Sequence, residues 1–177
     1  MSIRDLLVNG PLGFGTAPLG NMFRDIPDGE AEATVDAAWD HGTRFFDTAP
    51  MYGAGLAEIR LGKYLAQYDR DDYVLSTKVG RLVLDEIDTD ERDSEMFKFG
   101  RVNRVVYDYS EKGALASIEG SLNRLGWTDW ISFLCTTRHK IFTAMRGWRS
   151  WKPPAPARSA HWPGCASRAS SRAGAWA

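Results

Sequence analysis

Acidic residues are absent from the last 48 residues of this 177-residue chain, because no Asp or Glu follows Asp129. All 23 acidic residues lie in residues 1–129 with 14 of the 22 Lys and Arg, so that part has a net charge of -9. Residues 130–177 carry the other 8 basic residues and a net charge of +8. The overall net charge of -1 is therefore the sum of two unlike segments, not the balance of one evenly charged domain.

Branched aliphatic residues are also missing from the end of the chain, where no Leu, Ile or Val follows Ile141. Such a segment lacks the apolar face of a packed helix or strand, which predicts disorder. Six of the seven Trp nevertheless lie at or beyond Trp127, although disordered tails are usually poor in aromatic residues. We therefore divide the chain into a globular segment, residues 1–126, and an aberrant basic tail rich in Ala, Arg, Ser, Pro and Trp, residues 127–177.

Cysteine is scarce, since Cys135 and Cys165 are the two in the chain and the first 134 residues have none. This excludes a disulfide framework and a cysteine-based metal site, so we expect no metal. The sequence shows neither an apolar signal segment near Met1 nor an apolar run of membrane length. We expect a cytoplasmic protein that has no membrane partner.

Short apolar runs alternate with helical patterns along residues 1–126. Expected strands lie near Phe14, over 43–46 and over 73–77, and expected helices run from Asp28 to Gly42, over 57–68 and over 111–126. In the last helix, the apolar face comprises Leu115, Ile118, Leu122 and Leu125, and Gly126 is the expected C-cap. Residues 85–104 are polar and show no clear pattern. Alternating strands and helices predict an α/β fold with a parallel sheet.

Three ionisable residues follow the expected strands at their carboxyl ends. Asp47 and Lys78 end the second and third strands, and Tyr52 lies on the loop after the second. In parallel sheets these ends face the ligand side, so the three side chains are expected on one rim. Each also has a simpler interpretation, as a capping Asp, a packing Tyr or a solvated Lys. Spacing alone leaves both interpretations open.

The segments GFGTAPLGN, RFFDTAPMYG and LSTKVGR, in this order, resemble the aldo-keto reductases, and more narrowly the branch of D-threo-aldose 1-dehydrogenase and pyridoxal 4-dehydrogenase. The resemblance covers residues 10–126. It implies about the first half of a (β/α)8 TIM barrel, NADP or NAD as cofactor, and a small-molecule carbonyl or sugar substrate. The implied reaction interconverts an aldehyde, ketone or sugar lactol with its alcohol or lactone.

The resemblance also implies the roles of individual residues. Tyr52, Lys78 and Asp47 match three members of the family's catalytic tetrad, and Gly15, Thr16 and Ala17 would line the nicotinamide end of the cofactor together with Asp47. A tyrosine hydroxyl can protonate the oxygen of a carbonyl that accepts hydride. A free phenol has a pKa of about 10, and a nearby cation favours its ionised form, so Lys78 would assist and Asp47 would hold it.

The fourth tetrad member, a His, should follow the fourth strand, where this chain instead reads WTDWISFLCTTRHK. His139 and His161 do not match its position. If codons are regrouped by one base after Gly126, the reading permits the family pattern L-D-x-L-x-V-H-D, with His or Tyr across Cys135 and Thr136. We hypothesise a frameshift near Gly126. The alternative is a genuine basic tail, although no pattern in it supports a nucleic-acid partner.

Two classes of function therefore follow from the sequence. One is an NAD(P)-dependent aldo-keto reductase that is truncated and impaired. The other is a non-enzymatic product, either a pseudogene-like fragment or a basic-tailed interaction protein. The sequence predicts no oligomeric state.

Overall fold

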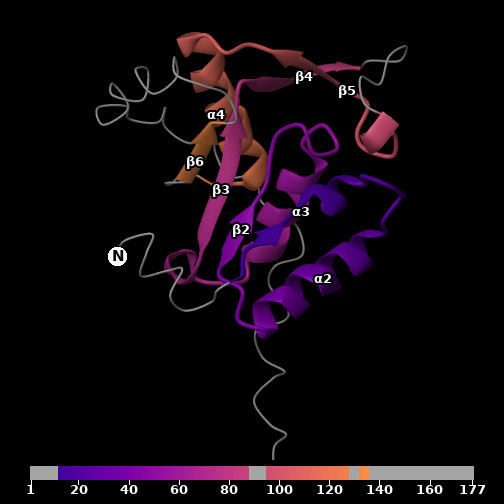
Figure 1. Cartoon of the computed structure of the whole chain (residues 1–177), viewed down its shortest axis with the longest axis vertical. Coiled ribbons are helices and arrows are strands. Elements are labelled where there is room, and N and C mark those ends of the chain that lie inside the picture. Colours follow the sequence, from indigo (N-terminus) through magenta and orange to yellow (C-terminus); the bar gives the residue numbers. More distant parts are fainter. Residues whose placement is uncertain (1–11, 88–94, 128–131, 136–177) are drawn as a thin grey trace, which may run out of the picture.

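Four parallel strands form the central sheet of the computed structural model, which describes residues 12–87, 95–127 and 132–135. The strands adjoin one another in the order β1 (Phe14–Gly15), β2 (Phe45–Asp47), β3 (Val74–Val79) and β6 (Ser132–Cys135). Phe46 of β2 lies in register with Phe14 on one side and Leu75 on the other. Figure 1 shows β2 and β3 side by side in the middle of the molecule. The expected parallel sheet is confirmed.

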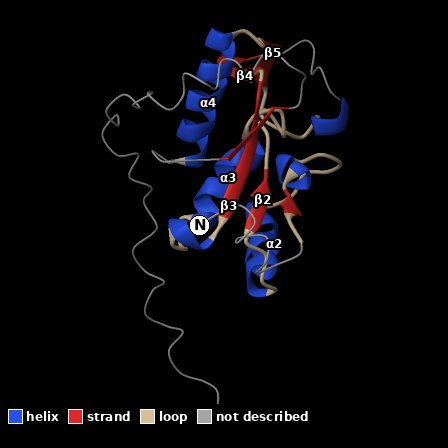
Figure 2. Cartoon of the chain, turned by 60° about the vertical axis from the view of Figure 1, so that its left-hand side comes forward, coloured by secondary structure: helices blue, strands red, loops and turns tan. Residues whose placement is uncertain are grey.

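Three helices connect these strands and cover the sheet. They are α2 (Asp28–Asp40), α3 (Leu56–Leu65) and α4 (Glu111–Leu125). Helix α3 contacts both α2 and α4, and α4 also contacts β3, so the helices form one layer along the strands (Figure 2). Short 3-10 turns lie at Ala17–Gly20, Arg70–Asp72 and Glu95–Phe97. None of the described helices is long and apolar enough to cross a membrane.

The helix ends follow local sequence signals. The side chain of Ser110 caps α4 by accepting a hydrogen bond from the backbone N–H of Gly113 at 3.0 Å. Gly126 ends α4 in the left-handed conformation with φ 72°, which a glycine adopts without a Cβ clash. Helix α2 begins directly after Pro27, as predicted.

The core lies between the outward face of the sheet and the helices. It includes Val35 of α2, Leu61 and Leu65 of α3, and Phe46, Leu75 and Val79 of the strands. Helix α4 contributes Ile118, Leu122 and Leu125, but Leu115 is 38% exposed, so its predicted burial was wrong. The buried face of α4 also includes the small residues Ala114, Ser117 and Ser121, which allow the helix to approach its neighbours closely.

A two-stranded antiparallel hairpin between β3 and α4 was not predicted. It consists of β4 (Arg81–Ile87) and β5 (Asn103–Tyr107), forms a sheet of its own, and crosses the upper end of β3 in Figure 1. Its side chains are mostly half-buried or exposed, without the strict alternation of a strand that has one face in a core. The sequence therefore carries little period-two signal in this stretch.

Strand β6 lies inside the segment that the sequence assigns to the tail. Ser132 pairs with Ser76 and Cys135 with Val79, so β6 continues the sheet beyond β3. Trp127 is also attached to the fold, since its backbone N–H donates to the carbonyl of Leu122 at 3.0 Å. Packed structure thus extends past residue 126. Residues 128–131 and 136–177 of the tail lie outside the described residues, as do His139, His161 and the predicted disorder.

Candidate active site

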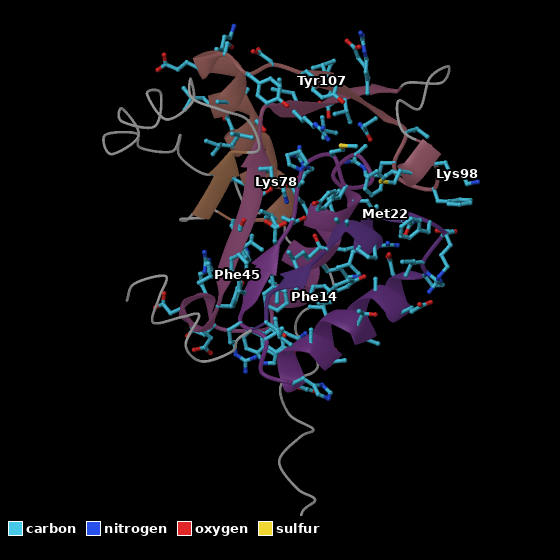
Figure 3. The ribbon with its side chains drawn as sticks, viewed as in Figure 1. Phe14, Met22, Phe45, Lys78, Lys98 and Tyr107 are labelled. Carbon is cyan, nitrogen blue, oxygen red and sulfur yellow. The ribbon has the colours of Figure 1, made fainter. Side chains whose placement is uncertain are left out.

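Asp47, Lys78 and Tyr52 come together at the carboxyl end of the sheet. The Nζ atom of Lys78 lies 2.5 Å from Oδ2 of Asp47 and 3.2 Å from the hydroxyl oxygen of Tyr52. A third hydrogen bond joins this ammonium to the backbone carbonyl of Thr48 at 3.0 Å. Figure 3 shows Lys78 beside β3, below the β4–β5 hairpin. The geometry favours the interpretation as a site over that of three unrelated surface residues.

The strands hold this ion pair in place. Asp47 is the last residue of β2 and pairs in register with Ser76 of β3, whose hydroxyl donates to Oδ1 of Asp47 at 2.8 Å. The carboxylate therefore accepts from Ser76 on one oxygen and from Lys78 on the other. The side chains of Lys78 and Asp47 are 18% and 27% exposed, so water reaches the pair only in part. Charge-assisted hydrogen bonds of this kind are stronger than neutral ones.

Tyr52 lies between Lys78 and the aromatic ring of Phe97. The Lys78 Nζ atom is 4.9 Å from the centre of the Tyr52 ring, and the Phe97 ring centre is 5.8 Å away. Because an ammonium group can only donate, the Tyr52 oxygen accepts this hydrogen bond and keeps its own hydrogen for another acceptor. The arrangement leaves the phenol as a proton donor toward a third molecule.

The backbone around Tyr52 is tightly turned. Gly53, Ala54 and Gly55 all have positive φ, at 63°, 51° and 86°. Gly20 lies against this turn, and a Cβ atom there would fall 2.5 Å from the backbone carbonyl carbon of Tyr52. Only a residue without a side chain fits at position 20, so the loop after β1 and the turn after β2 are in direct contact.

Residues 15–17 lie beside Asp47. The backbone N–H of Thr16 donates to the Asp47 carbonyl at 2.9 Å, and a Cβ atom at Gly15 would meet nothing within 4 Å. The buried side-chain hydroxyl of Thr16 has no hydrogen-bond partner, and the same holds for Thr48. A flat group can thus approach the backbone at Gly15. Ala17 begins the short 3-10 turn that follows.

Ser76 and Phe97 contribute to the site but were not predicted. Ser76 lies two residues before Lys78, and side chains two apart on a strand share a face, so the S-T-K motif contained this signal. Phe97 comes from the stretch without a clear pattern, and no sequence signal placed it against Tyr52. Among the described residues, no group of three or more His, Cys, Asp or Glu could hold a metal ion.

Comparison with known proteins identifies one family for this chain. The model of the aldo/keto reductase family matches residues 11–134. D-threo-aldose 1-dehydrogenase of Pseudomonas sp is 45% identical over 122 residues, which is 65% of this chain and 36% of that protein. Pyridoxal 4-dehydrogenase of Microbacterium luteolum is 37% identical over 132 residues, 67% of this chain and 36% of that protein.

A solved structure gives the same result. The aldo-keto reductase from Bacillus halodurans, in its holo form, is 28% identical with a TM-score of 0.51, over 70% of this chain and 35% of that one. The expectation of a partial (β/α)8 barrel is confirmed. The chain spans about a third of the length of the curated relatives it matches.

Proposed function

Because this chain belongs to the aldo/keto reductase family, we propose that it carries the proton-transfer part of an NAD(P)-dependent oxidoreductase. The reaction interconverts an aldehyde or ketone with its alcohol, or a sugar lactol with its lactone. One observation carries the proposal: Lys78 Nζ lies within hydrogen-bond distance of both the Tyr52 hydroxyl and the Asp47 carboxylate.

Tyr52 is the proposed acid and base. When a carbonyl is reduced, negative charge develops on its oxygen, and a positioned hydroxyl stabilises that charge and then donates its proton. The Tyr52 hydrogen is available because its oxygen accepts from Lys78. As the proton leaves, the adjacent ammonium offsets the negative charge that remains on Tyr52. In the oxidative direction, the same oxygen takes the proton from the alcohol.

Asp47 and Ser76 keep Lys78 in position. An ammonium on a flexible four-carbon side chain has many conformations, and a carboxylate at 2.5 Å restricts it to one. The hydroxyl of Ser76 fixes that carboxylate in turn. The strand register of β2 and β3 thus sets the distance between the cation and the phenol.

Residues 15–17 and Asp47 would hold the nicotinamide end of NAD or NADP. The open space at Gly15 and the unpartnered buried hydroxyl of Thr16 fit a flat polar ring beside the Asp47–Lys78 pair. When bound, the cofactor supplies or accepts the hydride at the carbonyl carbon. The chain's own contribution is to orient the substrate oxygen toward Tyr52. We propose a small carbonyl or sugar as substrate, because the matched relatives are named for an aldose and for pyridoxal.

A second candidate is a non-enzymatic product. It is favoured by the charge of +8 on residues 130–177. The two candidates differ in whether the 177-residue chain binds NADPH and turns over a substrate.

The experiment compares Tyr52→Phe with Tyr107→Phe, which removes the same hydroxyl from an exposed ring on β5. Turnover is followed by NAD(P)H absorbance with aldose and pyridoxal substrates, and binding by quenching of NADPH fluorescence. We expect Tyr52→Phe to lower kcat about 10²–10⁴-fold, with binding kept, and Tyr107→Phe to leave both unchanged. A wild-type chain that neither binds nor turns over would support the non-enzymatic candidate.

A further inference from the structure

A fully buried carboxylate lies behind the site, on the side of the sheet that faces the helices. Glu58, in the first turn of α3, has no exposed surface. One of its oxygens accepts from the hydroxyl of Thr77 at 2.7 Å, and the other accepts from Nε of Arg124 at 2.6 Å. Arg124 comes from the last turn of α4, so a single carboxylate joins α3, β3 and α4.

Such a buried ion pair needs an explanation other than stability. Removing two charges from water costs free energy that their attraction often fails to recover, and replacing such a pair by apolar residues of similar size is often neutral or stabilising. The geometry is nevertheless complete, since both carboxylate oxygens are bonded. What the pair does provide is a fixed spatial relation between the three elements that it joins.

Those three elements are the ones that determine the position of the Tyr52–Lys78 pair. Thr77 is the residue before Lys78 on β3. On the other side, the carbonyl of Tyr52 accepts from the backbone N–H of Ala57, the residue before Glu58, at 3.2 Å. Glu58 is thus one residue removed from a hydrogen bond to Tyr52 and is bonded to the neighbour of Lys78.

The turn between Tyr52 and α3 also depends on Arg124. Ala54 has φ 51°, a left-handed conformation that is unfavourable for a residue with a Cβ. The Arg124 side chain passes directly over Gly55, where a Cβ atom would fall 2.4 Å from its Cδ atom. Arg101 adds a hydrogen bond from Nη1 to the carbonyl of Ala54 at 3.1 Å. Side chains outside the turn, those of Arg124 and Arg101, therefore contact the strained residues 54 and 55.

We propose that Glu58 is a positioning residue of the site. Through Thr77 and Arg124 it holds the turn of residues 52–55 against β3, which keeps the Tyr52 oxygen within reach of Lys78. The catalytic part of this inference rests on the proposed function, whereas the local rigidity of the turn does not depend on it. If the Glu58–Arg124 ion pair served packing alone, it would stabilise the whole domain evenly and not the turn of residues 52–55 in particular.

The test uses the full chain with Glu58→Gln, Thr77→Val and a matched control, Glu30→Gln. Glu30, on α2, forms an exposed ion pair with Arg24, which precedes that helix, and both lie far from this turn in the sequence. Amide hydrogen exchange is measured by mass spectrometry over residues 52–59. We expect Glu58→Gln to speed exchange in this segment about tenfold or more, and Glu30→Gln to leave it unchanged. Thr77→Val, which removes one hydroxyl and keeps the β-branched shape, is the second measurement if Glu58→Gln folds poorly.

Rescue and kinetics separate positioning from packing. Adding Ala54→Gly to Glu58→Gln should restore slow exchange in part, because glycine adopts the left-handed conformation without the Cβ penalty. With a turnover assay, we expect Glu58→Gln to lower kcat about tenfold or more at unchanged KM. Exchange that rises evenly over α3 and α4, or a wild-type kcat in Glu58→Gln, would overturn the proposal. A wild-type chain without turnover would refute the proposed function alone, and exchange would still decide the role of Glu58.

Discussion

Breaking the Lys78–Asp47 ion pair should cost stability in a way that a double-mutant cycle can measure. The variants are Lys78→Met, Asp47→Asn and the double variant. At a separation of 2.5 Å, two unit charges attract by about 6–7 kcal/mol at an effective dielectric constant near 20. Desolvation of both groups offsets most of this attraction. Because the side chains keep 18% and 27% exposure, we expect a net coupling of about 1–3 kcal/mol.

The losses of unfolding free energy in the two single variants should together exceed the loss in the double variant. Lys78→Met leaves the Asp47 carboxylate with only the Ser76 hydroxyl as a side-chain donor, and Asp47→Asn leaves the ammonium with the Thr48 carbonyl and the Tyr52 hydroxyl. Each single change therefore includes the penalty of a partly buried charge without its counter-ion. The double variant removes both charges and avoids that penalty.

Urea unfolding followed by tryptophan fluorescence measures all four proteins. Trp39 is a suitable probe because its ring packs on the core and stacks on Tyr68 at 3.7 Å. We expect each single variant to lose about 1–3 kcal/mol of unfolding free energy. If the losses add within about 0.5 kcal/mol, the two charges are not coupled and the reasoning on the site is refuted.

Two further predictions concern glycine positions and a buried phenol. Gly20→Ala should destabilise the fold by about 1–3 kcal/mol and abolish turnover, because its Cβ would meet the Tyr52 backbone. Gly15→Ala meets no protein atom within 4 Å, so it should keep the melting temperature but weaken the quenching of NADPH fluorescence. Stability should also fall between about pH 10 and about pH 12: burial raises the pKa of Tyr73 to about 12, so the unfolded chain loses this proton first. Urea midpoints at pH 9 and 11.5 check this fall, and it should be smaller in Tyr73→Phe; an equal fall in that variant would contradict it.

The sequence predicted those parts of the fold in which a residue determines the structure of its own segment. Pro27 and Gly126 bound helices because of their backbone geometry, and the apolar runs at β2 and β3 form neighbouring strands of the sheet. Asp47 and Lys78 could be placed on one rim because parallel strands end on the same side. The contact between Tyr52 and Lys78 could not be predicted from strand ends alone, because the direction of a loop side chain depends on the turn that follows it.

The remaining features depend on tertiary contacts that leave no pattern along the chain. Leu115 looked like a core residue by its spacing, but the buried face of α4 passes through Ala114 and Ser117 beside it, and this leucine is partly exposed. Phe97 reaches Tyr52 only because a hairpin carries it over the end of β3. Glu58 resembled any acidic residue at a helix start until its two buried partners, from β3 and α4, were known.

Strand β6 lies in the segment where we hypothesise a changed reading frame. The family match continues to residue 134, past the frameshift hypothesised near Gly126, and Leu134 pairs with Lys78. The last base of the Cys135 codon, followed by the first two of Thr136, reads TAC or CAC, which encodes Tyr or His. A His there would directly follow β6, beside the strand that carries Lys78. Sequencing the gene should show CAC, followed by an open frame that continues the barrel, and the one-base correction should raise kcat about 100-fold or more over the 177-residue chain. A TAC codon, or stop codons throughout that frame, would show that the tail is the gene's own sequence.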